Sequence, residues 1–268
     1  MTKKSEISTI KCVLNGKGGV GKGVVSRVIT ALSIDKYKHI NLYEIDNNNK
    51  KGSVQSSIIN HRVFQVLDSK IAIFDVSFDE GDNEILSIID TGGSDDYKAV
   101  LETLYKNKVK NIDFYIPTLH DDETISNIQD TIQEIKKYFE NPKITLILNK
   151  AKSVDFNEVK KQFINIFGSE KYNYKSNYES IVNNISSIAI IPETHLIYLM
   201  KNHYRIEMAD LYLSSKDLND NEATYRSKWK IEAKELNDKE HYHSKMELLG
   251  FGVELIDFIE NCKKTLKL

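Results

Sequence analysis

The sequence predicts one α/β domain in which a doubly wound, mostly parallel β-sheet is flanked by helices. Short apolar runs rich in Ile and Val recur along the chain, as expected of strands that are buried on both faces. Apolar residues at helical spacing lie between several of these runs, and alternating strands and helices are typical of a doubly wound sheet. At 268 residues, of which 40% are hydrophobic, the chain is long enough to form such a domain.

Seven apolar runs are expected to form the strands. They are Ile10–Leu14, Ile40–Ile45, Ile71–Val76, Ile85–Ile89, Ile112–Ile116, Ile144–Leu148 and Ile188–Ile191. Helices are expected around Val25–Leu32 and Ile125–Phe139, because each segment carries an apolar stripe along one face. Asp121 or Asp122 can cap the second helix, since a carboxylate accepts hydrogen bonds from the free N–H groups of the first turn.

The C-terminal part of the chain has a different composition. Residues 206–243 are rich in charge and are expected to form an exposed helical segment or a mobile arm. Residues 244–268 carry apolar side chains at helical spacing, which predicts a last helix that packs back onto the sheet. No linker composition or internal repeat divides the chain, so residues 1–268 are expected to form one domain.

Composition places the chain in a reducing compartment, with the cytoplasm as the default. Cys12 and Cys262 are the only cysteines, and their spacing suits neither a disulfide framework nor a metal site. The start of the chain, Met1 to Ser8, is polar and basic, unlike a cleaved signal. No run of about 18 apolar residues occurs, so no membrane span is expected.

A glycine-rich string, Asn15 to Lys22, follows the first predicted strand and opens a helix. In this setting backbone N–H groups converge on phosphate oxygens. The glycines permit positive φ and close approach, while Lys22 and the helix N-terminus place positive charge at the β- and γ-phosphates. A simple turn is less favoured, because four glycines and two lysines in seven positions exceed what a turn requires. The predicted nucleotide-binding residues are Gly16, Lys17, Gly18, Gly19, Val20, Gly21, Lys22, Gly23 and Val24.

The segment Lys17–Gly23, KGGVGKG, resembles the deviant Walker A box KGGxGK[ST] of the ParA/MinD ATPases, which are P-loop NTPases. This resemblance implies ATP and Mg²⁺ as cofactors and a homodimer that closes on two ATP molecules. It also implies that Lys22 binds the nucleotide of its own subunit, whereas Lys17 reaches the partner's nucleotide. A second ammonium near the triphosphates offsets the negative charge that accumulates when two ATP molecules face each other.

Gly23 departs from the family pattern, which has a Mg²⁺-binding serine or threonine at this position. Glycine costs about 1 kcal/mol relative to alanine within a helix, so its presence here calls for a reason. Three explanations are open: water replaces the missing ligand, nucleotide binds without efficient turnover, or the residue was altered. Because Mg²⁺ keeps several waters in proteins, we expect hydrolysis that is weakened rather than abolished.

Two aspartates end predicted strands at the carboxyl edge of the sheet, where open α/β sheets place their sites. Asp46 follows Ile40–Ile45, and the resemblance implies that it orients the attacking water and lies near the metal. The alternative is that Asp46 is simply a polar residue at the end of a strand, without a catalytic role. Asp90 closes Ile85–Ile89 before two glycines, as in a Walker B strand, and is expected to act on Mg²⁺ or its waters. Asp75 is a second candidate for this role.

Two later strand ends, at Asn149 and Pro192, resemble family positions that contact the adenine base. Each is a short and weak signal. For Asn149 an amide that caps the end of a strand is an equally good interpretation.

The leading functional hypothesis is a ParA-like, ATP-dependent dimerising switch that segregates or positions plasmid or chromosomal DNA. An adaptor protein would stimulate hydrolysis. Nonspecific DNA is a weaker expectation, because the net charge is −2 and acidic residues dilute the basic group around Trp229. One alternative is an accessory ATPase of conjugative transfer or protein-complex positioning. The other is an ATP-binding interaction protein with little or no hydrolysis, because of Gly23.

Overall fold

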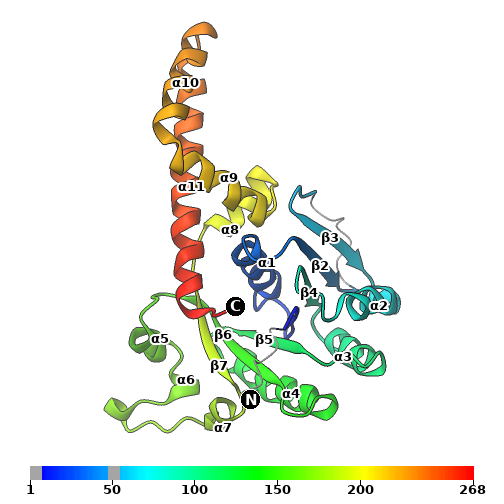
Figure 1. Ribbon diagram of the computed structural model, residues 1–268. Helices are drawn as coiled ribbons and strands as arrows, with labels where there is room; N and C mark the ends of the chain where they lie inside the picture. The colour runs from blue at the N-terminus through cyan, green and yellow to red at the C-terminus, as the bar shows by residue number, and fades with distance from the viewer. Residues whose placement is uncertain (1–7, 48–54) are drawn as a thin grey trace, which may run out of the picture.

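The computed structural model describes residues 8–47 and 55–268, and its centre is one parallel sheet (Figure 1). Within these residues the sheet has seven strands in the order β3-β2-β4-β1-β5-β6-β7. All neighbouring pairs are parallel, which confirms the predicted α/β fold class. The strands are β1 (Ile10–Val13), β2 (His39–Ile45), β3 (Ile59–Phe64), β4 (Ile85–Thr91), β5 (Ile112–Thr118), β6 (Lys143–Ala151) and β7 (Ser187–Pro192). Most of the Met1 to Ser8 segment lies outside the described residues.

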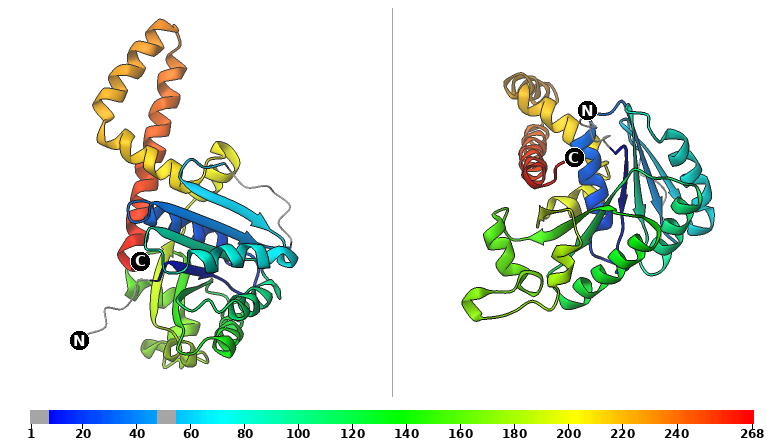
Figure 2. Two further views of the ribbon diagram at one scale, coloured as in Figure 1. Left: turned by 45° about the vertical axis from the view of Figure 1, so that its right-hand side comes forward. Right: turned by 60° about the horizontal axis from the view of Figure 1, so that its bottom comes forward.

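Helices cover both faces of the sheet, as a doubly wound fold requires (Figure 2, right). One face packs against α2 (Ser69–Asp79), α3 (Asp96–Lys106), α4 (Asp122–Tyr138), α5 (Phe156–Gln162), α6 (Ile164–Phe167) and α7 (Glu179–Asn183). The other face packs against α1 (Lys22–Ser33), α8 (Leu196–Leu199), α9 (Met208–Asp220) and α11 (Lys239–Thr265). Asp121 caps α4 by accepting a 2.9 Å hydrogen bond from the backbone N–H of Thr124, as the sequence predicts.

Six of the seven predicted strands form, but the prediction for Ile71–Val76 is wrong. This segment lies in α2, and the missing strand is β3, which pairs with β2 at one edge of the sheet. The apolar run misleads because it contains two faces of one helix. Ile73 is fully buried against the sheet, whereas Phe74 is 64% exposed and Phe78 is 83% exposed. Asp75, the second Walker B candidate, pairs on this helix with Arg62 instead of ending a strand.

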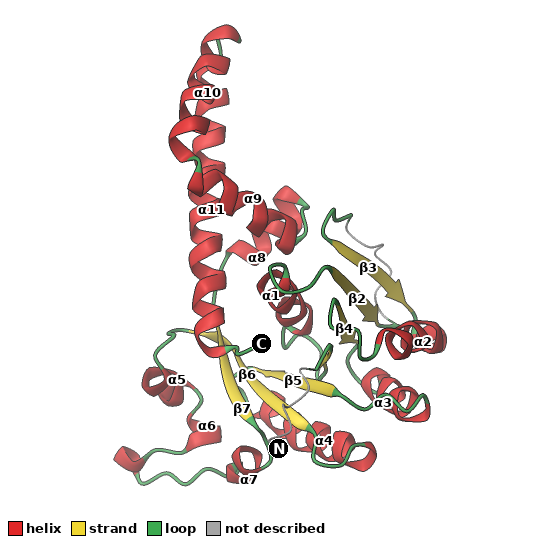
Figure 3. Ribbon diagram, in the orientation of Figure 1, coloured by secondary structure: helices red, strands yellow, loops and turns green. Residues whose placement is uncertain are grey.

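The charged C-terminal stretch begins with α9, which packs against the sheet layer, and continues in α10 (Glu222–Glu235) and the start of α11, which project away from the sheet (Figures 1 and 3). α9 leads into α10, which runs back along the N-terminal half of α11. Trp229 of α10 is only 5% exposed, and its ring centroid lies 5.6 Å from that of Tyr225. The other end of α11 reaches the sheet, where the hydroxyl of Thr265 accepts a 2.9 Å hydrogen bond from the N–H of Ile190. In the described part of the chain, no helix combines the length and apolarity that crossing a bilayer requires.

The strand order brings the predicted site residues together at one edge. β1 lies between β4 and β5, so the chain leaves β1, crosses β4 and returns in β2. Val13 is in register with Asp90, and Asp90 is in register with Glu44. The phosphate loop after β1 therefore emerges beside the acidic ends of β4 and β2, at the switch point where such sheets place ligands.

Candidate functional site

Hydrogen bonds of the Asn15 side chain hold the loop between β1 and α1 in place. The amide of Asn15 donates to the carbonyl of Pro117 at 2.8 Å, and its oxygen accepts from the N–H of Lys17 at 2.8 Å. Gly19 and Gly21 have φ values of 79° and 94°, a left-handed conformation that favours glycine. The loop thus wraps around the N-terminus of α1, which begins at Lys22 and carries partial positive charge.

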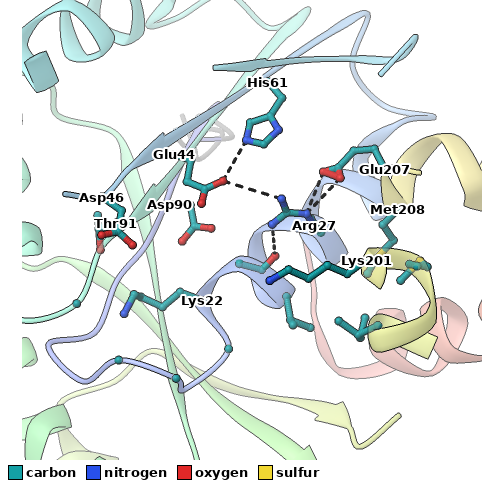
Figure 4. Close-up of a pocket in the computed structure, with 18 of the residues that line it drawn as sticks. Lys22, Arg27, Glu44, Asp46, His61, Asp90, Thr91, Lys201, Glu207 and Met208 are labelled. Carbon is teal, nitrogen blue, oxygen red and sulfur yellow. Dashed lines mark hydrogen bonds and ion pairs between the residues drawn. The ribbon is translucent and has the colours of Figure 1, made fainter. Parts of the chain in front are cut away.

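Lys22 lies at the floor of a cavity of about 1020 Å³ that opens above this loop (Figure 4). Its ammonium donates to the backbone carbonyls of Asn15 at 3.1 Å and Lys17 at 3.0 Å. Burial lowers the pKa of Lys22, and the nearby carboxylates of Asp90 and Asp46 oppose that shift. A buried ammonium whose hydrogen-bond acceptors among the described residues are two neutral carbonyls is well placed to take an anionic phosphate as its partner.

Carboxylates line the opposite wall of the cavity. Glu44 and Asp46 come from the end of β2, and Asp90 comes from β4. Asp90 is 4% exposed, and burial raises its pKa to about 7, with further upward pressure from Glu44. Arg27 and Lys22 flank it and act in the opposite direction (Figure 4). Buried or partly buried cations, Lys22 and Arg27, thus lie beside the carboxylates of Glu44, Asp46 and Asp90 around one polar space.

The turn after β4 contacts the phosphate loop directly. The N–H of Ser94 donates to the carbonyl of Gly16 at 2.6 Å, and a Cβ placed on Gly93 would lie 3.2 Å from the nitrogen of Gly18. A Cβ on Gly92 would lie 2.3 Å from Oδ2 of Asp96, so this position has room only for glycine. The turn after β4 and the loop after β1 thus pack backbone against backbone at the edge of the cavity.

The residues around Gly23 do not fit the Mg²⁺ site that the family pattern implies. Gly23 supplies no hydroxyl, and Val24 follows it. A Cβ placed on Gly23 would lie 3.1 Å from Nη1 of Arg27 and 3.3 Å from Oδ2 of Asp90. A guanidinium thus fills the space beside the position where the family has its metal-binding hydroxyl. The metal roles of Asp90 and Asp46 stay predictions.

Lys17 does not line the cavity. Its ammonium forms an ion pair with Glu123 in the first turn of α4, and the side chain is 36% exposed. A lysine at the rim of the site, held by one exposed carboxylate, has little to retain it there, since exposed pairs contribute about 0–1 kcal/mol. Its role toward a partner's nucleotide stays a prediction.

The two predicted adenine contacts occupy different surroundings. Asn149, 3% exposed, donates from its amide to the carbonyl of Val20 at 2.8 Å and so braces the phosphate loop. Pro192 ends the edge strand β7. Neither residue is among those that line the cavity. A role in base recognition stays a prediction for both.

Three residues of the site carry no motif and were missed by the sequence analysis. Arg27 lies one helical turn after Gly23, and an unexplained glycine at that spacing is the one available signal. Glu207 bonds Arg27 from 180 positions away in the sequence. His61 bonds Glu44 at 3.1 Å from β3, the strand that the sequence analysis did not predict.

A model of the Ras family matches residues 65–185, which is less than half of the chain and begins after the phosphate loop. No curated protein sequence matches.

Solved structures of nucleotide-binding proteins are similar to the chain. Apo McdA from Cyanothece is 11% identical with a TM-score of 0.50, over 79% of this chain and 94% of that chain. MinD from Aquifex aeolicus is 15% identical with a TM-score of 0.47, over 74% and 87%. A putative plasmid partition protein from Borrelia burgdorferi, solved with AMPPNP, is 13% identical with a TM-score of 0.47, over 74% and 90%.

At such identities a structural likeness concerns the fold and leaves substrate and cargo open. The sheet order, the loop after β1 and the acidic strand ends agree with that likeness. The chain therefore has the fold of the ParA/MinD-like P-loop ATPases.

Proposed function

We propose that the chain is an ATP-binding, dimerising switch of the ParA/MinD kind. The observation that carries this proposal is the loop from Asn15 to Gly23, which wraps a helix N-terminus and presents Lys22 to a cavity lined by Asp46 and Asp90. Backbone N–H groups, a helix dipole and a buried lysine form a binding site for phosphates. ATP should bind more tightly than smaller anions because its three phosphates contact all of these groups.

Binding of nucleotide is the first test. Calorimetry with ATP, ADP and GTP measures affinity and base preference together, and Lys22→Ala should weaken ATP binding by about 100-fold or more, because a charge-assisted contact contributes about 3 kcal/mol. Lys38→Ala is the matched control, since Lys38 is 67% exposed in a surface pair with Glu84. Equal affinity of both variants, or no uptake of any nucleotide by the unaltered chain, would remove the basis of the proposal.

Nucleotide-dependent dimerisation is the second part of the proposal. A ligand that binds the closed dimer more tightly than the open monomer shifts the population toward the dimer by mass action. Sedimentation with ADP, ATP and AMPPNP should give dimers only with a triphosphate. Lys17→Ala should prevent the dimer but keep ATP binding, because Lys17 lies at the rim and contacts Glu123 rather than the cavity. Loss of ATP binding in that variant would contradict a role in trans.

We propose that the cargo is DNA. An adaptor protein would stimulate the slow hydrolysis of ATP. Basic side chains along α10 support this proposed cargo, including Lys230 and Lys234, although Arg226 and Lys228 are paired with neighbouring glutamates. An ATP-dependent electrophoretic shift that vanishes at moderate salt would support DNA as the cargo. Absence of a shift at low salt would favour a positioning ATPase whose cargo is a protein complex, which is the alternative that this mixed charge leaves open.

A further inference from the structure

Gly23 and Arg27 form one structural unit. They are four positions apart on α1, so the side chain of Arg27 returns along the helix face over Gly23. Nη1 of Arg27 donates to the carbonyl of Gly23 at 3.0 Å and lies 3.1 Å from the point where a Cβ of Gly23 would be. A serine or threonine at position 23 would force the guanidinium to move. A side chain at position 23 would require this guanidinium to shift by at least a few tenths of an ångström, so glycine is the residue that leaves Arg27 undisturbed in its present position.

Acidic groups hold this guanidinium from several elements. Nε of Arg27 lies 3.0 Å from Oε1 of Glu207, which is 2% exposed and precedes α9. Nη2 lies 3.9 Å from Oε2 of Glu44 at the end of β2. Oδ2 of Asp90 lies 3.3 Å from the same Cβ point of Gly23 that Nη1 approaches. A fixed cation thus stands among three carboxylates, at the edge of the phosphate cavity (Figure 4).

This guanidinium lies where a P-loop site holds its divalent metal ion, and it carries positive charge as that ion does. There the metal neutralises phosphate oxygens and lies between the loop hydroxyl and the acidic end of a strand. A guanidinium is charged at all relevant pH values, is weakly hydrated, and binds phosphate through a planar fork of donors. Its side chain is 26% exposed, so the charge acts in a partly dehydrated setting where it is screened less than on the surface.

We propose that Arg27 is a built-in cation that replaces Mg²⁺ in this site, with Gly23 as the residue that admits it. The inference rests on the proposed nucleotide binding and deepens it. Nucleotide would bind with its β-phosphate near Lys22 and Arg27 and would not need a divalent ion. A guanidinium beside position 23 explains why glycine occurs there, whereas water-mediated Mg²⁺ binding gives no reason for a glycine.

The test compares nucleotide affinity with and without Mg²⁺, using fluorescent ADP and unlabelled ATP in competition, in millimolar MgCl₂ or in excess EDTA. For the unaltered chain we expect the two dissociation constants to differ by less than about threefold. In Arg27→Met, which keeps the apolar stem and removes the charge, affinity in EDTA should fall by about tenfold or more, as expected when one charge-assisted contact is lost.

A gain-of-function variant keeps the test independent of simple loss of stability. The double variant Gly23→Ser with Arg27→Met restores the hydroxyl and frees its space, so Mg²⁺ should now tighten ADP binding by about tenfold or more. Far-UV circular dichroism and urea unfolding identify any variant that does not fold, and Arg27→Lys provides a second variant that keeps a positive charge.

The outcomes separate the two proposals. Binding by the unaltered chain that is lost by about tenfold or more in EDTA would overturn the role of Arg27 and leave nucleotide binding intact. A double variant that folds and binds ADP without any response to Mg²⁺ would also overturn it, because the space and hydroxyl would then not govern metal use. Absence of nucleotide binding under every condition would instead refute the proposed function.

Discussion

Gly21→Ala is the substitution whose cost the structure predicts most directly. Gly21 has φ 94° and ψ 27°, and an L residue with a Cβ loses roughly 1–2 kcal/mol in this conformation. The new Cβ would also lie 2.1 Å from Nδ2 of Asn149. Asn149 would have to leave the carbonyl of Val20, and loss of a buried hydrogen bond costs about 1–3 kcal/mol. The free energy of unfolding should therefore fall by about 2–5 kcal/mol.

Neighbouring glycines separate the two contributions. Gly19 has φ 79° but nothing within 4 Å of a Cβ, so Gly19→Ala should show the backbone cost alone, about 1–2 kcal/mol. Gly18 has neither a left-handed φ nor a neighbour within 4 Å, so Gly18→Ala should change stability by less than about 0.5 kcal/mol. Urea unfolding of the nucleotide-free protein, with equal m-values, measures all three.

A double-mutant cycle tests the clash itself. Asn149→Ala removes the obstructing amide, so Gly21→Ala should cost less in that background than in the unaltered chain, by about 1–3 kcal/mol. Strictly additive effects would show that Asn149 is not the obstacle. A Gly21→Ala protein as stable as the Gly18→Ala control would refute the reasoning as a whole, because neither strain nor contact would then be present.

Three further substitutions test other parts of the structure. Glu207→Gln should lower the free energy of unfolding by about 3 kcal/mol in urea titrations, because the mostly buried charge of Arg27 loses its main partner; a change below about 0.5 kcal/mol would contradict the pair. Asp90→Asn should stabilise the nucleotide-free protein: the folded-state pKa is raised from 3.8 to about 7, so ionisation costs stability as pH rises through that window. That gain should be roughly 4 kcal/mol above pH 7 and should shrink toward pH 4; a gain independent of pH would refute it. Ile73→Ala should cost about 2–5 kcal/mol and Phe78→Ala less than about 0.5 kcal/mol in thermal melts, because Ile73 is buried and Phe78 is 83% exposed; a strand buried on both faces would instead lose stability at both positions.

The central sheet and the phosphate loop were predictable because their signals are local. β1, the glycines and Lys22 lie within a few positions of each other, and strands buried on both faces appear as apolar runs. Asp46 and Asp90 could be placed beside the loop for the same reason, since each ends such a run. These predictions need only the periodicity of a segment and the rule that parallel strands share a carboxyl edge.

The errors arise where tertiary contacts decide the structure. Ile59–Phe64 has four partly buried residues in a row and pairs only along one side, so its sequence lacks the apolar run of a central strand. Ile71–Val76 has that run but supplies a helix with exposed apolar residues. The partnership of Arg27 with Glu207 has no local signal, because the two residues meet only when α9 packs beside α1.

That partnership gives the site a second consequence. Glu207 is the residue before α9, and α9 leads into the hairpin of α10 and α11. Any event that draws the guanidinium of Arg27 toward a phosphate weakens its bond to Glu207 and leaves a buried carboxylate with less compensation, which is unfavourable unless the start of α9 adjusts. One guanidinium therefore joins the start of α1 to the start of α9 beside the cavity, because Nη1 of Arg27 donates to the carbonyl of Gly23 at 3.0 Å and Nε donates to Oε2 of Glu207 at 3.2 Å.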